Sequence, residues 1–145
     1  MMWFFYAFLA SVLWGIAYVF GGRLLQSIHV QTLLLLELGI GTLTFLIWSL
    51  HKHTLGTDIT TVLKDGTLSK QLVLSIVSFN VANLLIILSV REKNAVLASV
   101  LEVSYPLFVV LFSWLFFRES HMNLRTAAGG LMILAGVFIV YWNNR

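Results

Sequence analysis

Residues 94–117, NAVLASVLEVSYPLFVVLFSWLFF, decide the fold class of this chain. The run carries one charged side chain, Glu102, and exceeds the roughly 20 apolar residues that a helix needs to cross the hydrocarbon core of a bilayer. Similar runs cover most of the remaining chain, at residues 3–20, 30–50, 71–90 and 124–142. We therefore expect an all-α integral membrane protein, a five-transmembrane-helix bundle forming a single domain over residues 1–145.

Composition excludes most alternatives to this fold class. Hydrophobic residues make up 59% of the chain and charged residues 10%, whereas soluble domains have about 45–50% and 25%. The apolar runs are continuous and about twice as long as a barrel strand, which favours helices that satisfy their own backbone hydrogen bonds. Residues 3–20 have no basic segment before them and no cleavage site after them, so we expect them to remain as a helix.

The basic residues stand singly between the apolar runs, despite a net charge of +3 and a pI near 9.5. Such scattered charges offer no face to nucleic acid, so the expected partner is the lipid bilayer. With five spans, the side opposite the N-terminus carries Arg23, Arg91, Lys93 and Arg145, and the N-terminal side carries Lys52, Lys64, Lys70, Arg118 and Arg125. Orientation normally follows a clear excess of such residues in cytoplasmic loops. This balance fits insertion in both orientations with antiparallel pairing, or an orientation set by a partner or a local feature.

The longest polar connection, between the second and third apolar runs, is expected to hold a short surface helix capped by Thr57 or Asp58 and ended by Gly66. His51 and His53 lie in the same connection, without further ligands at metal-binding spacing. The sequence also lacks cysteine and the motifs G-x-S-x-G, H-E-x-x-H and Walker A. We therefore expect no metal, no cofactor and no enzyme.

Two acidic residues, Glu37 and Glu102, lie inside apolar runs. At 1.5 Å per residue they are about 10 and 12 Å deep from the same side of the membrane. Asn83 reaches that level from the antiparallel third run, Asn80 lies one turn deeper, and Trp14 comes from the first run. An ionisable side chain within a membrane helix is costly, and it indicates a functional site by default.

The alternative to a functional role is a structural one, in which the two acids stay protonated and hydrogen-bond Asn80, Asn83 or Ser99 to hold the helices together. Glu102 is the stronger functional candidate, because the other acid lies nearer the membrane surface. Pro106, the single proline of the chain, follows Glu102 by one helical turn. Its ring removes the helical partner of the Glu102 carbonyl, so we expect a kink or hinge beside this acid.

Helical spacing groups these residues on common faces. One side of the run 94–117 carries Ala95, Ala98, Ser99, Glu102, Tyr105, Pro106 and Val109. One side of the first run carries Ser11, Trp14, Gly15 and Tyr18. Aromatic rings on such a face attract organic cations, although they also serve as packing or interface anchors. In the last run, Gly129 and Gly136 lie two turns apart on a small-residue face that permits close packing, either within one subunit or in a dimer.

Residues 94–140, NAVLASVLEVSYPLFVVLFSWLFFRESHMNLRTAAGGLMILAGVFIV, resemble the end of an EamA-type domain of the drug/metabolite transporter superfamily. The matching residues are Pro106, Glu119, Gly129, Gly130, Ala135 and Gly136. The segment LWGIAYVF, residues 13–20, is similar to the first helix of that domain through Trp14 and Gly15. The resemblance spans the whole chain, because five helices make up one such domain.

This resemblance implies a transporter. Typical members have two such domains in tandem, in opposite membrane orientations, with the substrate path between them. A chain with one domain is therefore expected to form a homodimer or to pair with a related half-size chain. The sequence departs from the family where members often carry arginine in the second helix, near Glu37, and the first helix lacks the essential glutamate of the small multidrug resistance branch.

We interpret the chain as a multi-pass secondary transporter of the plasma (inner) membrane, exporting a small organic solute by proton exchange as an antiparallel pair. An apolar cavity disfavours the charged form of a carboxyl, which can then exchange a proton for a cationic solute. The predicted substrate- and proton-binding residues are Glu102, Glu37, Asn83, Asn80, Trp14, Tyr18, Ser99 and Tyr105. Two alternatives stay open: transport of a neutral, anionic or lipid-linked solute, and a membrane subunit that does not transport.

Overall fold

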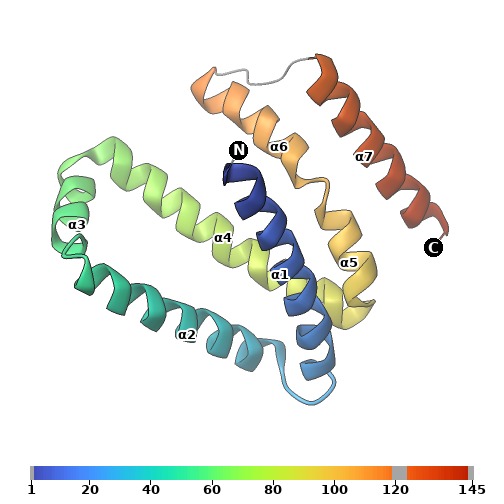
Figure 1. Cartoon of the computed structure of the whole chain (residues 1–145), viewed down its shortest axis with the longest axis horizontal. Coiled ribbons are helices and arrows are strands. Elements are labelled where there is room, and N and C mark those ends of the chain that lie inside the picture. Colours follow the sequence, from blue (N-terminus) through green and yellow to red (C-terminus); the bar gives the residue numbers. More distant parts are fainter. Residues whose placement is uncertain (1, 119–123, 144–145) are drawn as a thin grey trace.

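The computed structural model describes residues 2–118 and 124–143, without the side chains of residues 124–126. Every regular element within these residues is helical (Figure 1). The elements are α1 Met2–Leu24, α2 Val30–His51, α3 Leu55–Lys64, α4 Gly66–Glu92, α5 Ala95–Glu102, α6 Tyr105–Phe112, the π-helical turn η1 Ser113–Phe117, and α7 Leu124–Asn143. The all-helical prediction is confirmed for this part of the chain, whereas Glu119 and Arg145 lie outside it.

Four stretches of the described residues are long and apolar enough to cross a membrane: Met2–Leu24, Val30–His51, Gly66–Glu92 and Ala95–Phe117. The last of these comprises α5, α6 and η1. Helix α7 lies where the fifth span was expected, but its described apolar part, Ala127–Asn143, is shorter than the other four. The chain is thus a multi-pass membrane protein, whose described residues contain four candidate spans and one shorter apolar helix.

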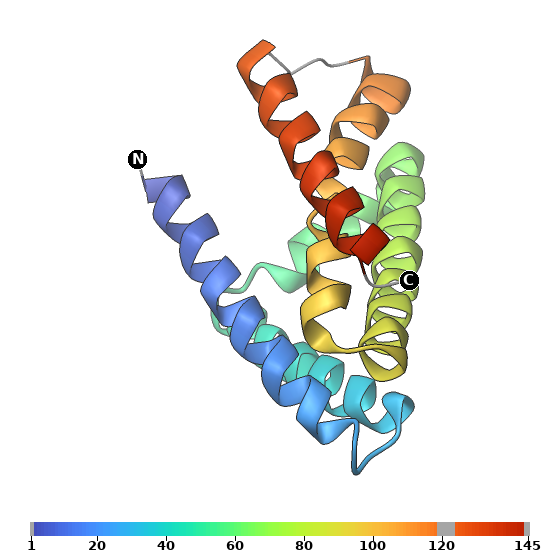
Figure 2. The same cartoon turned by 90° about the vertical axis from the view of Figure 1, so that its right-hand side faces the viewer.

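The helices pack together at one end of the bundle and diverge toward the other (Figure 1, Figure 2). At the first end, which we call the packed end, α1 ends, α2 begins, α4 ends and α5 begins. The buried hydrophobic side chains of the described residues gather there, and they are Tyr18, Val30, Leu33, Ile87, Val90 and Ala98. We call the other end, with α3, the start of α4 and α6, the open end; α3 and α6 contain no buried residue.

Small residues permit the close approach of helices at the packed end. A Cβ atom on Gly22 of α1 would lie 3.5 Å from the Cβ of Ala95 in α5. One turn further along α5, Ala98 is 1% exposed and packs against Tyr18 and Val90. Backbones that approach this closely gain dispersion contacts, which hold helices together where lipid offers an equally apolar solvent.

The fourth span is interrupted beside Pro106, as the sequence predicts. Helix α5 ends at Glu102, a short turn follows, and α6 begins at Tyr105. Pro106 lies in the first turn of α6, where its missing N–H group leaves no helical bond unmade. The hydroxyl of Ser104 in the turn donates to the carbonyl of Leu101 at 2.7 Å. The break therefore places the Glu102 carboxyl at the end of a helix rather than in its middle.

The connection between α2 and α4 differs from the sequence prediction in two ways. Helix α3 begins at Leu55, so Thr57 and Asp58 lie in its first turn and neither residue is the N-cap. Gly66 does not end this helix and instead begins α4, whose N-cap Asp65 accepts hydrogen bonds from two backbone N–H groups of the first turn. An aspartate cap satisfies N–H groups that would otherwise lack partners, and this outweighs the poor helix propensity of the glycine after it.

Candidate functional site: two acidic cavities on either side of α1

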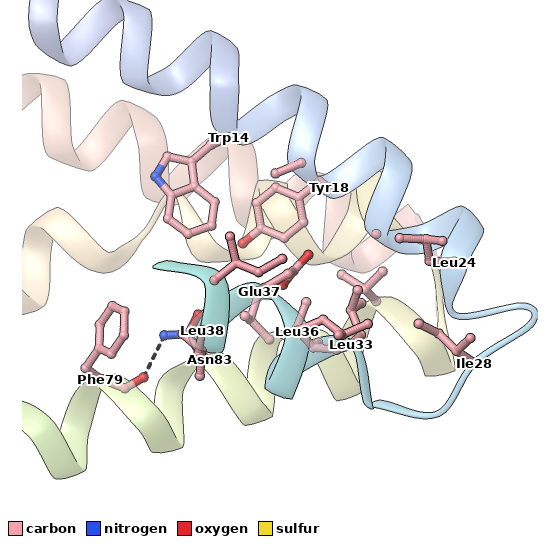
Figure 3. Close-up of a pocket in the computed structure, with 17 residues that line it drawn as sticks. Trp14, Tyr18, Leu24, Ile28, Leu33, Leu36, Glu37, Leu38, Phe79 and Asn83 are labelled. Carbon is pink, nitrogen blue, oxygen red and sulfur yellow. Dashed lines mark hydrogen bonds between the residues drawn. The ribbon is translucent and has the colours of Figure 1, made fainter. Parts of the chain in front are cut away.

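A cavity of about 550 Å³ lies between α1, α2 and α4 (Figure 3). Its lining is mainly apolar, and its polar groups come from three helices: Trp14 and Tyr18 of α1, Glu37 of α2 and Asn83 of α4. Figure 3 shows the two aromatic rings on one side of this space and Glu37 and Asn83 on the other. None of the described lining residues is Lys, Arg or His, so Glu37 carries the one formal charge of this lining.

A second cavity, of about 440 Å³, lies between α1 and the break that separates α5 from α6. Its acidic residue is Glu102, and the described lining again includes no Lys, Arg or His. The predicted site residues that line it are Trp14, Tyr18, Ser99, Glu102, Tyr105 and Pro106. The sequence prediction that Glu102, the hinge proline and an aromatic face lie together therefore agrees with the geometry.

Trp14 and Tyr18 line both cavities, so α1 forms the wall between them. Their ring centroids are 6.0 Å apart with an interplanar angle of 37°. Tyr18 is 9% exposed, and its hydroxyl donates a hydrogen bond to the carboxylate of Glu102. The aromatic wall is thus fixed to one of the two acids and faces the space that holds the other.

The sequence of the packed end explains why Tyr18 reaches Glu102. Its ring packs against Val90 of α4 and Ala98 of α5, and Ala98 has a side chain small enough for α1 to lie close. Glu102 follows Ala98 by one helical turn and therefore lies on the same side of α5. The contact depends on the close approach of α1 and α5 at small residues. The sequence of a single helix does not show which of its faces meets another helix.

The asparagine residues have a different role from the one that the structural alternative assigned to them. The side-chain amide of Asn83 donates to the carbonyl of Phe79 in its own helix at 2.8 Å (Figure 3). Asn80 does the same with Ile76, also at 2.8 Å, and is not among the described lining residues of either cavity. Of the two, Asn83 alone belongs with the candidate site.

Sequence reasoning missed the direct pairing of Tyr18 with Glu102. It placed both residues in the site, but it named Asn80, Asn83 and Ser99 as partners for the acids, and the Ser99 hydroxyl donates instead to the carbonyl of Val96 at 3.0 Å. The sequence does contain a signal for this pairing. Tyr18 is the one aromatic residue with a hydroxyl group on the inward face of the first apolar run.

The small-residue face of α7 is only partly used within the subunit. A Cβ atom on Gly130 would lie 2.7 Å from Cδ2 of Leu107 in α6, so this glycine permits the approach of the two helices. At Gly129 and Gly136, the predicted packing or dimer positions, no described atom lies within 4 Å of such a Cβ. The predicted glycines and the glycine used inside the subunit are therefore different residues.

Within the described residues, the acids of the two cavities are not grouped with further metal-ligating side chains. Among residues 2–118 and 124–143, no group of three His, Cys, Asp or Glu side chains is placed to hold a metal ion. The chemistry that these cavities offer is recognition of a solute by carboxyl groups, aromatic faces and one amide, together with proton exchange at the carboxyl groups.

Comparison with known proteins places the chain among transporters. The sequence profile of the EamA-like transporter family matches residues 1–142. A curated relative from Methanothermobacter thermautotrophicus, named "Uncharacterized transporter", is 31% identical over 71 residues, which are 49% of this chain and 20% of that protein. The alignment thus spans about a fifth of that relative's length. No solved structure matches the chain.

Proposed function

The chain belongs to the EamA-like transporter family, and from that premise we propose that it is a secondary transporter that exports a small organic cation in exchange for protons. The observation that carries this proposal is the lining of the two cavities. Each holds one carboxyl group, both share the aromatic pair Trp14 and Tyr18, and the described lining of each lacks a basic residue. Such surroundings favour a cation over an anion.

The exchange follows from the energetics of a carboxyl group in an apolar membrane cavity. An isolated negative charge there is costly, so the acid binds either a proton or a cation. A solute and a proton that compete for the same group cannot occupy it together, and protons flowing inward across the plasma (inner) membrane then drive the solute outward. Cavities of about 300–1,000 Å³ typically hold small organic ligands, and the larger cavity here is about 550 Å³.

We further propose that α7 completes a five-span domain and that two such domains work as an antiparallel pair. The second domain would be a second copy of this chain or a related half-size chain. The nearly equal division of Lys and Arg residues, four against five, supports insertion in both orientations. The open surroundings of Gly129 and Gly136 on α7 support an interface there, because small residues let helices of two subunits approach closely.

One observation favours a second candidate, a membrane subunit that does not transport. The bond between Tyr18 and Glu102 joins α1 to α5, and a polar bond between helices can serve packing alone. In that case Glu102 would have no role in solute movement. Transport of a neutral, anionic or lipid-linked solute, with the acid as a hydrogen-bond acceptor, is the third possibility.

Flux into liposomes tests these candidates. The purified chain is reconstituted, a pH gradient is imposed, and uptake is measured for a panel of organic cations that includes benzyltrimethylammonium, with benzenesulfonate as the anionic counterpart. We expect gradient-driven movement of at least one cation and none of the anion. In detergent, adding that cation should also release protons, as only an exchange mechanism requires.

Substitution of the acids then identifies the coupling group. Glu102→Gln keeps the shape of the side chain but not its charge, so gradient-driven flux should fall at least about tenfold while the protein still folds. Glu37→Gln should have a smaller effect. Glu92→Gln is the matched control, since Glu92 is an acid that lies outside both cavities at the end of α4. Undiminished coupling in a stably folded Glu102→Gln protein would support the packing role instead.

A further inference from the structure

The two acids of the candidate site line different cavities, and one tyrosine lines both. Glu37 lines the larger cavity, Glu102 lines the smaller one, and Tyr18 lines both. Its hydroxyl is bonded to Glu102, while its ring is part of the wall that a solute beside Glu37 would touch. We propose, resting on the transport function above, that Tyr18 is a positioning residue. It couples solute binding at Glu37 to the breaking of the hydrogen bond between Tyr18 and Glu102.

The ring is held at a junction of three helices. Tyr18 belongs to α1 and packs against Val90 of α4 and Ala98 of α5, with 9% of its surface exposed. The larger cavity is lined by Tyr18 and Val90 of this junction, and the smaller cavity is lined by Tyr18. A buried ring in such a seat does not shift without changing the shape of both spaces, because packed cores rearrange between discrete states rather than deforming continuously.

A cation in the larger cavity would attract the ring of Tyr18. Positive charge is attracted to the faces of Trp14 and Tyr18 and to the carboxyl of Glu37. Rotation of the ring about its own axis leaves the hydroxyl in place, but a shift of the whole ring toward the cation draws the hydroxyl away from Glu102. Binding therefore breaks the bond to Glu102, and this carboxylate is then free to bind the proton or the cation that is exchanged.

The groups that face Tyr18 from its neighbours are few. The titratable side chains in the described lining of the two cavities are Glu37 from α2, Glu102 from α5, Tyr105 from α6 and Tyr18 itself. Helix α4 contributes Asn83, which does not titrate, and no basic residue in that lining competes for either carboxyl. Among these described residues, Tyr18 is therefore the one titratable residue that lines both cavities.

A double-mutant cycle measures this communication. The half-saturating concentration of benzyltrimethylammonium is determined by equilibrium binding to the full chain in detergent, for the parent protein, Glu37→Gln, Glu102→Gln and the double variant. We expect the effect of Glu37→Gln to differ at least about fivefold with and without Glu102→Gln, the size of a modest coupling between sites. Adding Tyr18→Phe to all four proteins keeps the ring and removes the hydroxyl, and the coupling should disappear.

Tyr6→Phe is the matched control, because Tyr6 also belongs to α1 but is 66% exposed and lines neither cavity, so the loss of its hydroxyl should leave the coupling intact. A second measurement avoids substitution at Tyr18 if that variant fails to fold. In the parent protein, binding of benzyltrimethylammonium should change the infrared carboxyl band that Glu102→Gln removes, although the cation sits beside Glu37.

Each result of these measurements has a definite meaning. Cation binding with the same coupling in the presence of Tyr18→Phe, or with an unchanged Glu102 band, overturns the role of Tyr18 and leaves the transport function standing. Failure of the parent protein to bind any cation of the flux panel removes the transport function and this inference together. Loss of coupling with retained binding supports both.

Discussion

The packed end and the open end of this bundle differ in what holds their helices. At the packed end, Leu33 is 2% exposed and Ala98 is 1% exposed, and contacts join α1, α2, α4 and α5. At the open end, α3 and α6 contain no buried residue, and large side chains face outward, such as Leu63 at 72% and Phe108 at 53%. Lipid solvates these apolar groups as well as protein does, so exposure there costs little, and contact between helices must come from close packing of backbones and small side chains.

The difference assigns separate tasks to the two ends. The packed end fixes the relative positions of Tyr18, Glu37 and Glu102, which lie on three different helices. The helix break at Pro106 begins directly after Glu102, so the segment beyond it is free to adopt another direction without disturbing the packed end. We infer that the packed end is the fixed part of the transport cycle and that the open end moves or pairs.

The largest expected effect is on stability at the packed end. Leu33→Ala removes a buried side chain that packs against Val30 and Ile87, and it should lower the free energy of unfolding by about 2 kcal/mol through the cavity that it leaves. Leu35→Ala, two positions along the same helix, is the matched control, because Leu35 is 73% exposed and its loss should change little. Unfolding in mixed detergent micelles measures both, and equal losses would deny that the packed end is special.

The sequence predicted the elements better than their contacts. Continuous apolar runs predict the long helices, and Pro106 predicts the break after α5, because both features depend on local chemistry alone. The start of α4 was misplaced, since the cap at Asp65 is strong enough to begin a helix at a glycine. The pairing of Tyr18 with Glu102 was not foreseen, because it depends on how closely α1 and α5 approach, which several faces of each helix would permit.

The next effect concerns the junction between the two ends. Pro106→Ala restores the N–H group that a continuous helix requires, so α5 and α6 should join through the present turn. Turnover should fall about tenfold if this break is the hinge of a conformational step, while cation binding in detergent changes little. Val109→Ala, one turn further along α6, serves as a control. Unaltered turnover in Pro106→Ala would make the break a structural kink without a role in transport.

A smaller effect is expected on the pairing of subunits. Gly129→Leu and Gly136→Leu add bulk where no described atom of the subunit lies within 4 Å, so folding should be preserved while association weakens by about fivefold. Gly130→Leu should instead impair folding of the subunit, since its side chain would meet Leu107 within the same subunit. Energy transfer between labelled copies in liposomes measures association. Unchanged association in both outward-facing variants would place the interface elsewhere.

The smallest effect compares two helix caps, one at each end of the bundle. Asn94 starts α5 at the packed end, where its side-chain oxygen accepts from the backbone N–H of Leu97 at 2.8 Å. Asp65 starts α4 at the open end and accepts from the N–H groups of Thr67 and Leu68 at 2.7 and 3.2 Å. The local bonding is similar, and Asp65 makes one bond more. If these cap hydrogen bonds alone decided the outcome, Asp65→Ala would therefore lower the free energy of unfolding as much as Asn94→Ala or more.

We expect the reverse order, because the two first turns support different amounts of packing. The turn after Asn94 carries Ala98, whose burial against Tyr18 belongs to the core of the packed end, so Asn94→Ala should lower the free energy of unfolding by about 1 kcal/mol. The turn after Asp65 can open by itself while the rest of α4 stays in place, so Asp65→Ala should speed hydrogen exchange at residues 66–69 and barely change global unfolding. Micelle unfolding combined with hydrogen exchange at residues 66–69 and 95–98 separates the two outcomes. A larger global loss for Asp65→Ala would mean that the open end is as tightly coupled to the fold as the packed end, and the division of tasks between them would have to be given up.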